Sequence, residues 1–211
     1  MYITMDSKKR SYEMRARRDA ASATHDAIVN AAIDCVTAQR SLAITLGAVA
    51  ERANVTVKTV LRHFGSRDGL IEAAFSHAYR DVLAERAAPA GDAEAALSVL
   101  IAHYERRGDM VLGLLAEERQ DPRARSMCDA GRLAHRTWID EVFAGALPVQ
   151  PAERSRLIDA LVVATDVYSW KLLRRDRGLS VEQVRDRMLL MTNALLAVSA
   201  APRGAVERTS Q

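Results

Sequence analysis

The sequence has few of the residues that mark secreted, membrane-spanning or disulfide-rich proteins. It contains two cysteines, Cys35 and Cys128, which lie far apart in apolar helical settings. We interpret them as reduced core thiols, with a disulfide or redox switch as the alternative. Since no apolar run reaches about 18 residues, we expect no membrane-spanning helix. Because no apolar segment follows the first basic residues, we also expect no signal peptide and a cytoplasmic location.

Signals for strands and for catalysis are also missing. Aromatic residues make up only 5% of the chain, and no stretch alternates between apolar and polar residues with a period of two. We therefore predict an all-α fold. The chain shows no glycine-rich phosphate loop, no nucleophile in a recognisable turn, and no His/Cys cluster at metal-binding spacing. We expect neither an enzyme nor a bound cofactor or metal.

The charges that are present are unevenly distributed. Hydrophobic residues make up 49% and charged residues 27% of the 211 residues, which is typical of a globular protein. Residues 1–66 contain ten Lys or Arg and six Asp or Glu, whereas the remaining residues contain 20 and 21. A basic amino-terminal third beside a slightly acidic remainder is typical of a DNA-facing head on a body that does not contact DNA.

Residues 45–64 predict two short helices joined by a tight turn. Thr45 can cap the first helix, whose apolar residues recur three and four positions apart. Asn54 lies where the chain must turn, and asparagine tolerates the left-handed conformation that such a turn needs. Thr56 can cap the second helix, which extends to about Phe64. This pattern indicates a helix-turn-helix, with a helical hairpin carrying a solvated charged face as the alternative.

The second helix would present a polar face that suits a nucleic-acid duplex. Lys58, Thr59, Arg62 and His63 lie opposite its apolar residues. Arginine and lysine can donate to base acceptors or to phosphates, which makes this face a candidate recognition surface.

Residues 45–70 resemble the tetracycline-repressor (TetR) family of bacterial transcriptional regulators. After the two helices, Gly65 and Ser66 end the second helix and cap a third. The matching positions are Thr45, Leu46, Val49, Ala50, Ala53, Val55, Thr56, Thr59, Val60, His63, Phe64, Ser66 and Leu70. With this resemblance, we assign DNA contacts to Thr45, Thr56, Val57, Lys58, Thr59, Leu61, Arg62, His63 and Arg67.

Several positions depart from the family pattern. Leu61 replaces a tyrosine that usually contacts phosphate, and Gly47 replaces an arginine that often reads a base. Arg67 replaces a lysine and retains its charge, and Asn54 replaces the glycine of the turn. Arg40 stands where a glycine usually follows the first helix, so that helix must end in another way.

We predict four segments along the chain. Residues 1–20 would be a disordered basic arm, which is either a solvated tail or an arm that follows the DNA backbone or enters the minor groove. Residues 21–66 would form the DNA-binding domain, residues 67–201 a helical body, and residues 202–211 a flexible tail. Beyond the motif, the spacing of apolar residues and caps predicts helices over 24–39, 67–86, 92–107, 110–119, 121–147, 152–175 and 181–200.

The last two predicted helices are apolar around most of their circumference. A deep core would explain this, and so would a surface covered by a second subunit. The family resemblance implies the second, a homodimer joined by its last two helices as a four-helix bundle. On this basis we assign the interface to Leu161, Val162, Leu172, Met188, Met191 and Leu195.

Polar and aromatic residues interrupt the apolar faces of the body. Each of them alone is explained by an ordinary core position. Asp166 lies in the apolar run LVVATDVYSW, where a carboxylate must be paired or hydrogen-bonded. Taken together, the resemblance implies an effector pocket between the body helices, assigned to His103, Tyr104, His135, Trp138, Asp166, Tyr168 and Trp170.

The sequence therefore predicts a DNA-binding transcriptional regulator, a repressor released from a palindromic operator by a small-molecule effector. Its partners would be double-stranded operator DNA, a small molecule and a second copy of the chain. The alternative is a helical ligand-binding or interaction protein that does not bind DNA specifically, because Leu61 and Gly47 remove two usual contacts.

Overall fold

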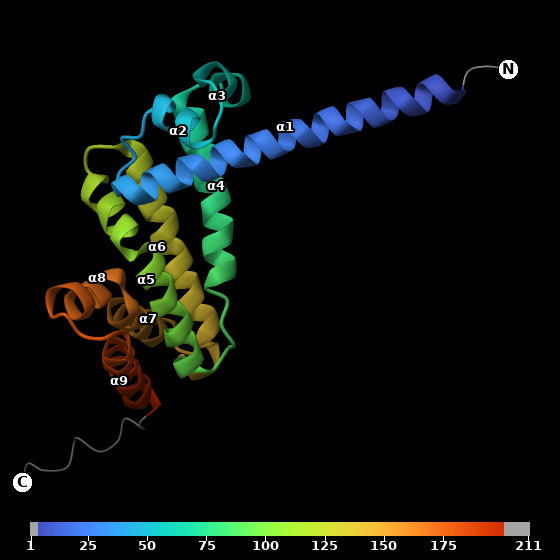
Figure 1. Cartoon of the computed structure of the whole chain (residues 1–211). Helices are drawn as coiled ribbons and strands as arrows, with labels where there is room; N and C mark the ends of the chain where they lie inside the picture. Colours follow the sequence, from blue (N-terminus) through green and yellow to red (C-terminus); the bar gives the residue numbers. More distant parts are fainter. Residues whose placement is uncertain (1–3, 201–211) are drawn as a thin grey trace, which may run out of the picture. The chain divides into compact units, whose positions relative to one another are not determined.

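The computed structural model describes residues 4–200 of the chain (Figure 1). Within that range every regular element is a helix, which confirms the all-α prediction. The chain divides into two compact units, a head that ends at Arg80 and a body that begins at Asp81. The division falls inside a helix, whereas the sequence had placed it at residues 66 and 67. The predicted tail, residues 202–211, lies outside the described residues.

The head is built from three helices and the first part of a fourth. These are α1 (Thr4–Gln39), α2 (Leu46–Arg52), α3 (Val57–Phe64) and α4 (Arg67–Glu85). Their buried core includes Ile28, Val29, Val49, Val60 and Leu70, each at most 2% exposed. Leu70, Ile71 and Ala74 of α4 are also buried, which is why the head extends into this helix.

Helix α1 begins at Thr4, so the prediction of a disordered arm over residues 1–20 is wrong for residues 4–20. Figure 1 shows this part of α1 extending away from α2 and α3. Residues 12–23 are all exposed, as expected from their few apolar side chains. They continue the helix because residues 1–39 contain no glycine or proline and residues 13–23 are rich in alanine and arginine. Once the packed part of α1 has formed, each added residue costs little.

The body consists of the helices that follow Asp81. They are α5 (Ala93–Glu117), α6 (Pro122–Val142), the 3₁₀ turn η1 (Ala144–Ala146), α7 (Pro151–Thr165), α8 (Val167–Lys171), the π-helical η2 (Leu172–Asp176) and α9 (Val181–Ala200). Helix α5 packs against α6, α8 and α9, and α7 packs against α6 and α9. Asp92, Asp121 and Ser180 cap the starts of α5, α6 and α9, since the side chain of each accepts a hydrogen bond from an amide of the first turn. Ser180 also completes a capping box, because Gln183 accepts a hydrogen bond from its backbone amide.

Helix α5 is continuous, although the sequence predicted an interruption at Gly108. A side chain at this position would collide with Trp170, since an added Cβ would lie 2.5 Å from its Cζ3 atom. Trp170 is completely buried and donates from its indole nitrogen to Glu105 at 2.8 Å. Gly108 is therefore a close-packing position of the kind that brings two helices together, and it does not end the helix.

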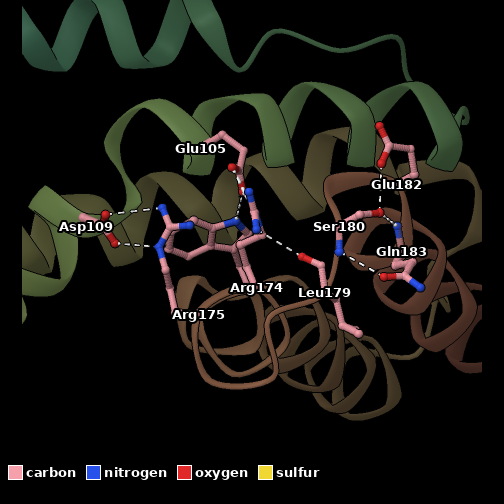
Figure 2. A network of polar contacts seen from close by, with 9 residues as sticks. Glu105, Asp109, Arg174, Arg175, Leu179, Ser180, Glu182 and Gln183 are labelled. Atoms are coloured by element: carbon pink, nitrogen blue, oxygen red, sulfur yellow. Dashed lines mark hydrogen bonds and ion pairs between the residues drawn. The ribbon is translucent and has the colours of Figure 1, made fainter.

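A set of ion pairs surrounds this contact (Figure 2). Arg174 binds Glu105 at 3.0 Å, and Arg175 binds Asp109 at 3.0 Å, so two successive cations of η2 hold two acids one turn apart on α5. The Arg175 guanidinium also lies 4.5 Å from the centre of the Trp170 ring. Together these contacts attach η2 to α5.

The long helix predicted over residues 152–175 is broken at Asp166. The backbone of Asp166 is extended, with ψ at 155°, and its carboxylate accepts a hydrogen bond from the Tyr168 amide at 2.8 Å. Asp166 thus caps α8. The two cysteines are free and buried, as their interpretation as reduced core thiols requires. No helix within residues 4–200 is long and apolar enough to cross a membrane.

Candidate functional site

The turn between α2 and α3 has the geometry predicted from its sequence. Thr45 accepts a hydrogen bond from the Ala48 amide, and Thr56 accepts one from the Thr59 amide, each at 3.1 Å. Asn54 adopts the left-handed conformation, with φ at 52°. These local bonds satisfy the amide groups that open each helix and set the direction of α3.

Helix α3 buries one face and exposes the other. Val60 is fully buried, whereas Lys58 and Arg62, one helical turn apart, are exposed. No carboxylate among the described residues lies within ion-pair distance of these two cations. Val57 and Leu61 are also exposed on α3, so the two cations stand beside apolar side chains that can contact thymine methyl groups or sugars. This face carries the donors that duplex recognition requires.

His63 and Arg67 are less available for contacts with DNA than the sequence suggested. The His63 ring is half-buried at the end of α3, with its centre 6.3 Å from that of His25 in α1. Arg67 donates from Nε to the carbonyl of Ile44 at 2.8 Å and from a terminal nitrogen to the carbonyl of Leu42. Arg67 therefore holds the loop before α2, a role that no local sequence signal indicated. Its contact with DNA stays a prediction.

Arg40 takes the place of the glycine usual after the first helix without changing the backbone. Its φ is 53°, in the left-handed region that glycine adopts most easily. The helix therefore ends in the ordinary conformation, at the energetic cost that a side chain imposes there.

The body contains a buried polar cluster centred on Arg86 and His135. A terminal nitrogen of Arg86 contacts Nδ1 of His135, and Nε2 of His135 lies 3.0 Å from the Thr165 hydroxyl. Because arginine can only donate, Nδ1 of His135 must accept, so the ring is neutral and carries its proton on Nε2. Burial and the Arg86 charge lower the pKa of His135 to about 3, which agrees with a neutral ring.

A second set of contacts holds the end of α4 in the body. Glu85 accepts two hydrogen bonds from Arg107, at 2.8 and 3.1 Å, and lies 3.3 Å from Nδ1 of His103. The Arg107 hydrogen bonds lower the pKa of Glu85 to about 2, and burial with the Arg86 charge lowers that of His103 to about 4. Trp138 donates to the carbonyl of Arg86 at 2.8 Å. Glu85, the last residue of α4, is thereby attached to α5, and Arg86, the residue after it, is attached to α6.

The structure brings together most of the predicted effector-pocket residues. His103, Tyr104, His135, Trp138 and Trp170 are buried, and the Tyr104 hydroxyl donates to the carbonyl of Thr165 at 2.9 Å. Burial raises the pKa of Tyr104. Sequence reasoning missed Glu85, Arg86, Arg107 and Thr165, because their pairing depends on residues far away in the chain.

Tyr168 and Asp166 do not belong to this buried cluster. Tyr168 is 51% exposed, so it lies outside the buried cluster, and its assignment to an effector pocket stays a prediction. Asp166 caps α8 and is half-buried, and desolvation raises the pKa of its carboxyl. Its position in an apolar run therefore reflects a helix break, which an aspartate at the cap position could have indicated.

The predicted interface residues divide into two groups. Leu161 and Met188 are 0% exposed within the single chain and belong to the body core, so their assignment to a dimer interface was wrong. Val162 and Leu195 are partly buried against that core. Leu172 and Met191 remain exposed, and so do Val163, Tyr168, Leu190 and Val198. The exposed apolar side chains lie on α7, α8, η2 and α9, and sequence periodicity could not separate them from the core.

Comparison with known proteins supports the assignment of the head. The sequence model for bacterial regulatory proteins of the tetR family matches residues 28–74. The HTH-type transcriptional regulator BetI of Burkholderia mallei (strain NCTC 10229) is 46% identical over 52 residues, which cover 23% of this chain and 27% of that protein. BetI of Burkholderia pseudomallei (strain K96243) matches equally. The chain thus spans about a quarter of the curated relatives it matches.

Solved structures share the fold over most of the chain. A tetR-family transcriptional regulator from Streptomyces coelicolor superimposes with a TM-score of 0.67 at 19% identity, covering 85% of this chain and 82% of that one. A transcriptional regulator from Rhodococcus sp. Rha1 gives 0.62 at 16% identity, covering 84% and 99%. The helix-turn-helix geometry and the family match therefore identify residues 28–74 as similar to the DNA-binding head of bacterial regulatory proteins of the tetR family, and the solved structures share the fold of the chain beyond that head.

Proposed function

We propose that the protein is a homodimeric transcriptional repressor that binds an inverted-repeat operator and is released from it by a small-molecule effector. The exposed cationic face of α3 carries this proposal. Lys58 and Arg62 project from a helix whose opposite face is locked by Val60 and whose start is capped by Thr56. A rigid short helix that presents two cations one turn apart suits insertion into a major groove. Because chromosomal DNA would be the partner, we place the protein in the bacterial cytoplasm.

A dimer follows from the exposed apolar surface of the body. Monomeric proteins rarely leave large apolar patches in water, and the exposed apolar side chains of the last elements, α7, α8, η2 and α9, would form such a patch if they lie on one face. One chain carries one recognition helix, so a two-fold dimer would read two half-sites about one turn, roughly 34–36 Å, apart. This supports an inverted-repeat operator.

Helix α4 supplies a route from the effector to the DNA. It starts just after α3, where Ser66 accepts a hydrogen bond from the Gly69 amide. It ends at Glu85, which binds Arg107, and the next residue, Arg86, makes a buried contact with His135. An effector that rearranges those contacts would move the last turn of α4. A shift of one packed helix by a fraction of a turn is enough to displace a recognition helix.

The central test is operator binding by single variants of α3. An operator selected from a random duplex pool should lose affinity by about 1–3 kcal/mol with Lys58→Ala or Arg62→Ala if either side chain reads a base edge. Arg156→Ala, which removes an exposed arginine from the body, serves as the matched control and should bind as the wild type does. Unchanged affinity in both α3 variants would contradict the assignment of this face to DNA.

The dimer is tested by placing a charge on its proposed surface. Leu172 is 59% exposed, so Leu172→Arg should leave the single chain folded but put an unpaired charge into the interface. Sedimentation should then show monomers. Val149→Arg, at a position 98% exposed outside this surface, should remain dimeric. If Leu172→Arg is still a dimer, the interface lies elsewhere on the chain.

The effector is tested through thermodynamic linkage. A compound that raises the melting temperature of the wild type should weaken operator binding. Saturating operator must then weaken binding of the compound by the same factor. Equal compound affinities with and without operator would show that the compound is not an inducer.

A further inference from the structure

Most of the positive charge of the head lies outside the helix-turn-helix. Residues 21–66 contain four Lys or Arg and three Asp or Glu, and Arg52 pairs with Asp34 at 3.0 Å. Residues 1–20 contain six Lys or Arg and three Asp or Glu. The recognition unit itself is therefore almost neutral, although attraction to phosphates supplies much of the affinity of DNA-binding proteins. The positive charge is concentrated in the amino-terminal part of α1.

The carboxyl-terminal end of that part of α1 lies close to the recognition helix, α3. The His25 ring lies 4.8 Å, centre to centre, from the ring of Phe64, the last residue of α3. From His25 the helix continues back to Thr4, a length of about 30 Å at 1.5 Å per residue. This is close to one turn of duplex, roughly 34 Å. If α3 lies in a DNA groove, the segment of α1 that leads away from His25 would therefore begin at the edge of that groove.

The described cations of this segment form no ion pair with any carboxylate of the described residues. Arg15, Arg17 and Arg18 are exposed. No carboxylate in the described part of the chain lies within ion-pair distance of their guanidinium groups. They point in different directions around the helix, which suits contact with a continuous backbone better than reading of individual bases. The DNA backbone is opposite in charge to these arginines. Under the proposed function, it is also the molecule that already lies beside α3.

We propose that residues 4–23 of α1 form a helical arm that lies along the phosphate backbone of duplex DNA outside the half-site read by α3. This rests on the proposed function and adds to it a second DNA contact that carries no base specificity. The arm supplies the electrostatic part of binding, and α3 supplies recognition. Leu61 and Gly47 cannot make the contacts usual at their positions, and the arm compensates for them.

The test changes charge on the arm and an equal charge on the body. The full chain carrying Arg15→Gln, Arg17→Gln and Arg18→Gln retains helix-forming residues, so circular dichroism should show no loss of helix. Its matched control carries Arg119→Gln, Arg125→Gln and Arg156→Gln, three exposed arginines of the body. The probe is a mixed-sequence 40-base-pair duplex, titrated by fluorescence anisotropy from 50 to 200 mM salt.

The arm variant should bind with a weaker salt dependence. Three lost phosphate contacts reduce the slope of log affinity against log salt by about 2.7 for each arm that lies on the duplex, or about 5.4 for the proposed dimer, so the wild-type advantage should shrink about 40-fold per bound arm between 50 and 200 mM. The body control should retain the wild-type slope. On an operator selected from random DNA, hydroxyl-radical protection outside the half-sites should disappear only in the arm variant.

Two outcomes would overturn the arm. One is wild-type affinity and slope in the arm variant, and the other is an equal loss in the arm and body variants, which would indicate net charge alone. The proposed function is judged separately by the wild type and by Lys58→Ala with Arg62→Ala. If these α3 changes abolish binding while the arm variant binds normally, the regulator stands and the arm does not. If the wild type binds no duplex at 50 mM salt, the proposed function itself has failed.

Discussion

Replacing Gly108 by alanine should destabilise the body even though alanine favours helices. Gly108 lies inside α5, where alanine is normally more stable than glycine by about 1 kcal/mol. The new Cβ would lie 2.5 Å from Cζ3 and 2.7 Å from Cη2 of Trp170, whereas carbon atoms pack at about 3.5–4.0 Å. One of the two helices must therefore move by about 1 Å.

Trp170 has little freedom to make that movement. Its ring is fully buried, its indole nitrogen donates to Glu105 at 2.8 Å, and Arg175 lies 4.5 Å from the ring centre. Overpacking of this kind costs about 1–3 kcal/mol, and loss of a hydrogen bond to a charged group adds about 1.5–3 kcal/mol. After the gain in helix propensity of about 1 kcal/mol, we expect Gly108→Ala to lower the free energy of unfolding by roughly 1.5–5 kcal/mol.

A double-mutant cycle separates the collision from other causes. Trp170→Leu removes the Cζ3 and Cη2 atoms, so in that background Gly108→Ala should become stabilising, by about 1 kcal/mol. Urea unfolding followed by tryptophan fluorescence reports on the body, since Trp138 and Trp170 both lie there. The reasoning is refuted if Gly108→Ala stabilises the protein when Trp170 is present.

Three further predictions concern the head and the buried histidines. Thr56→Ala removes the cap of α3, so it should lower the free energy of unfolding by about 1 kcal/mol and weaken operator binding. Thr56→Ser should retain the stability and the operator affinity of the wild type. Thermal unfolding and operator titration measure these effects. Gly69→Ala would place a Cβ 2.3 Å from the carbonyl oxygen of Phe64, so it should lower the melting temperature despite its helix propensity. The folded-state pKa values of His103 and His135, about 4 and about 3, lie below the usual 6.5, so the unfolded chain binds more protons as the pH falls. Stability should therefore be complete above pH 6.5 and decrease toward pH 4, by up to about 1.4 kcal/mol per pH unit for each histidine, and equal urea midpoints at pH 7 and pH 5 would contradict this.

The sequence predicted the local structure of the head because its signals lie within a few residues of one another. The caps at Thr45, Thr56 and Ser66 and the left-handed turn at Asn54 are all present as expected. A cap depends on an amide two or three positions away, so the neighbouring sequence contains the whole interaction. The exposed Lys58 and Arg62 follow from the helical period alone.

Three helices differ from the sequence prediction. Gly108 was interpreted as a helix end because its neighbour in space, Trp170, is far away in the chain. Asp166 was interpreted as part of a continuous helix, although it caps a new one. Residues 4–20 were interpreted as disordered from their composition, although α1 extends through them.

By itself, the sequence determined that the chain is helical, where its recognition motif lies, and which face of α3 carries its cations. Only the tertiary structure decided that Leu161 and Met188 belong to the core while Leu172 and Met191 remain exposed. It also decided that Arg86 pairs with a buried neutral histidine. The reason is physical: periodicity shows that a helix face is apolar, but which surface covers that face depends on how the helices pack against one another.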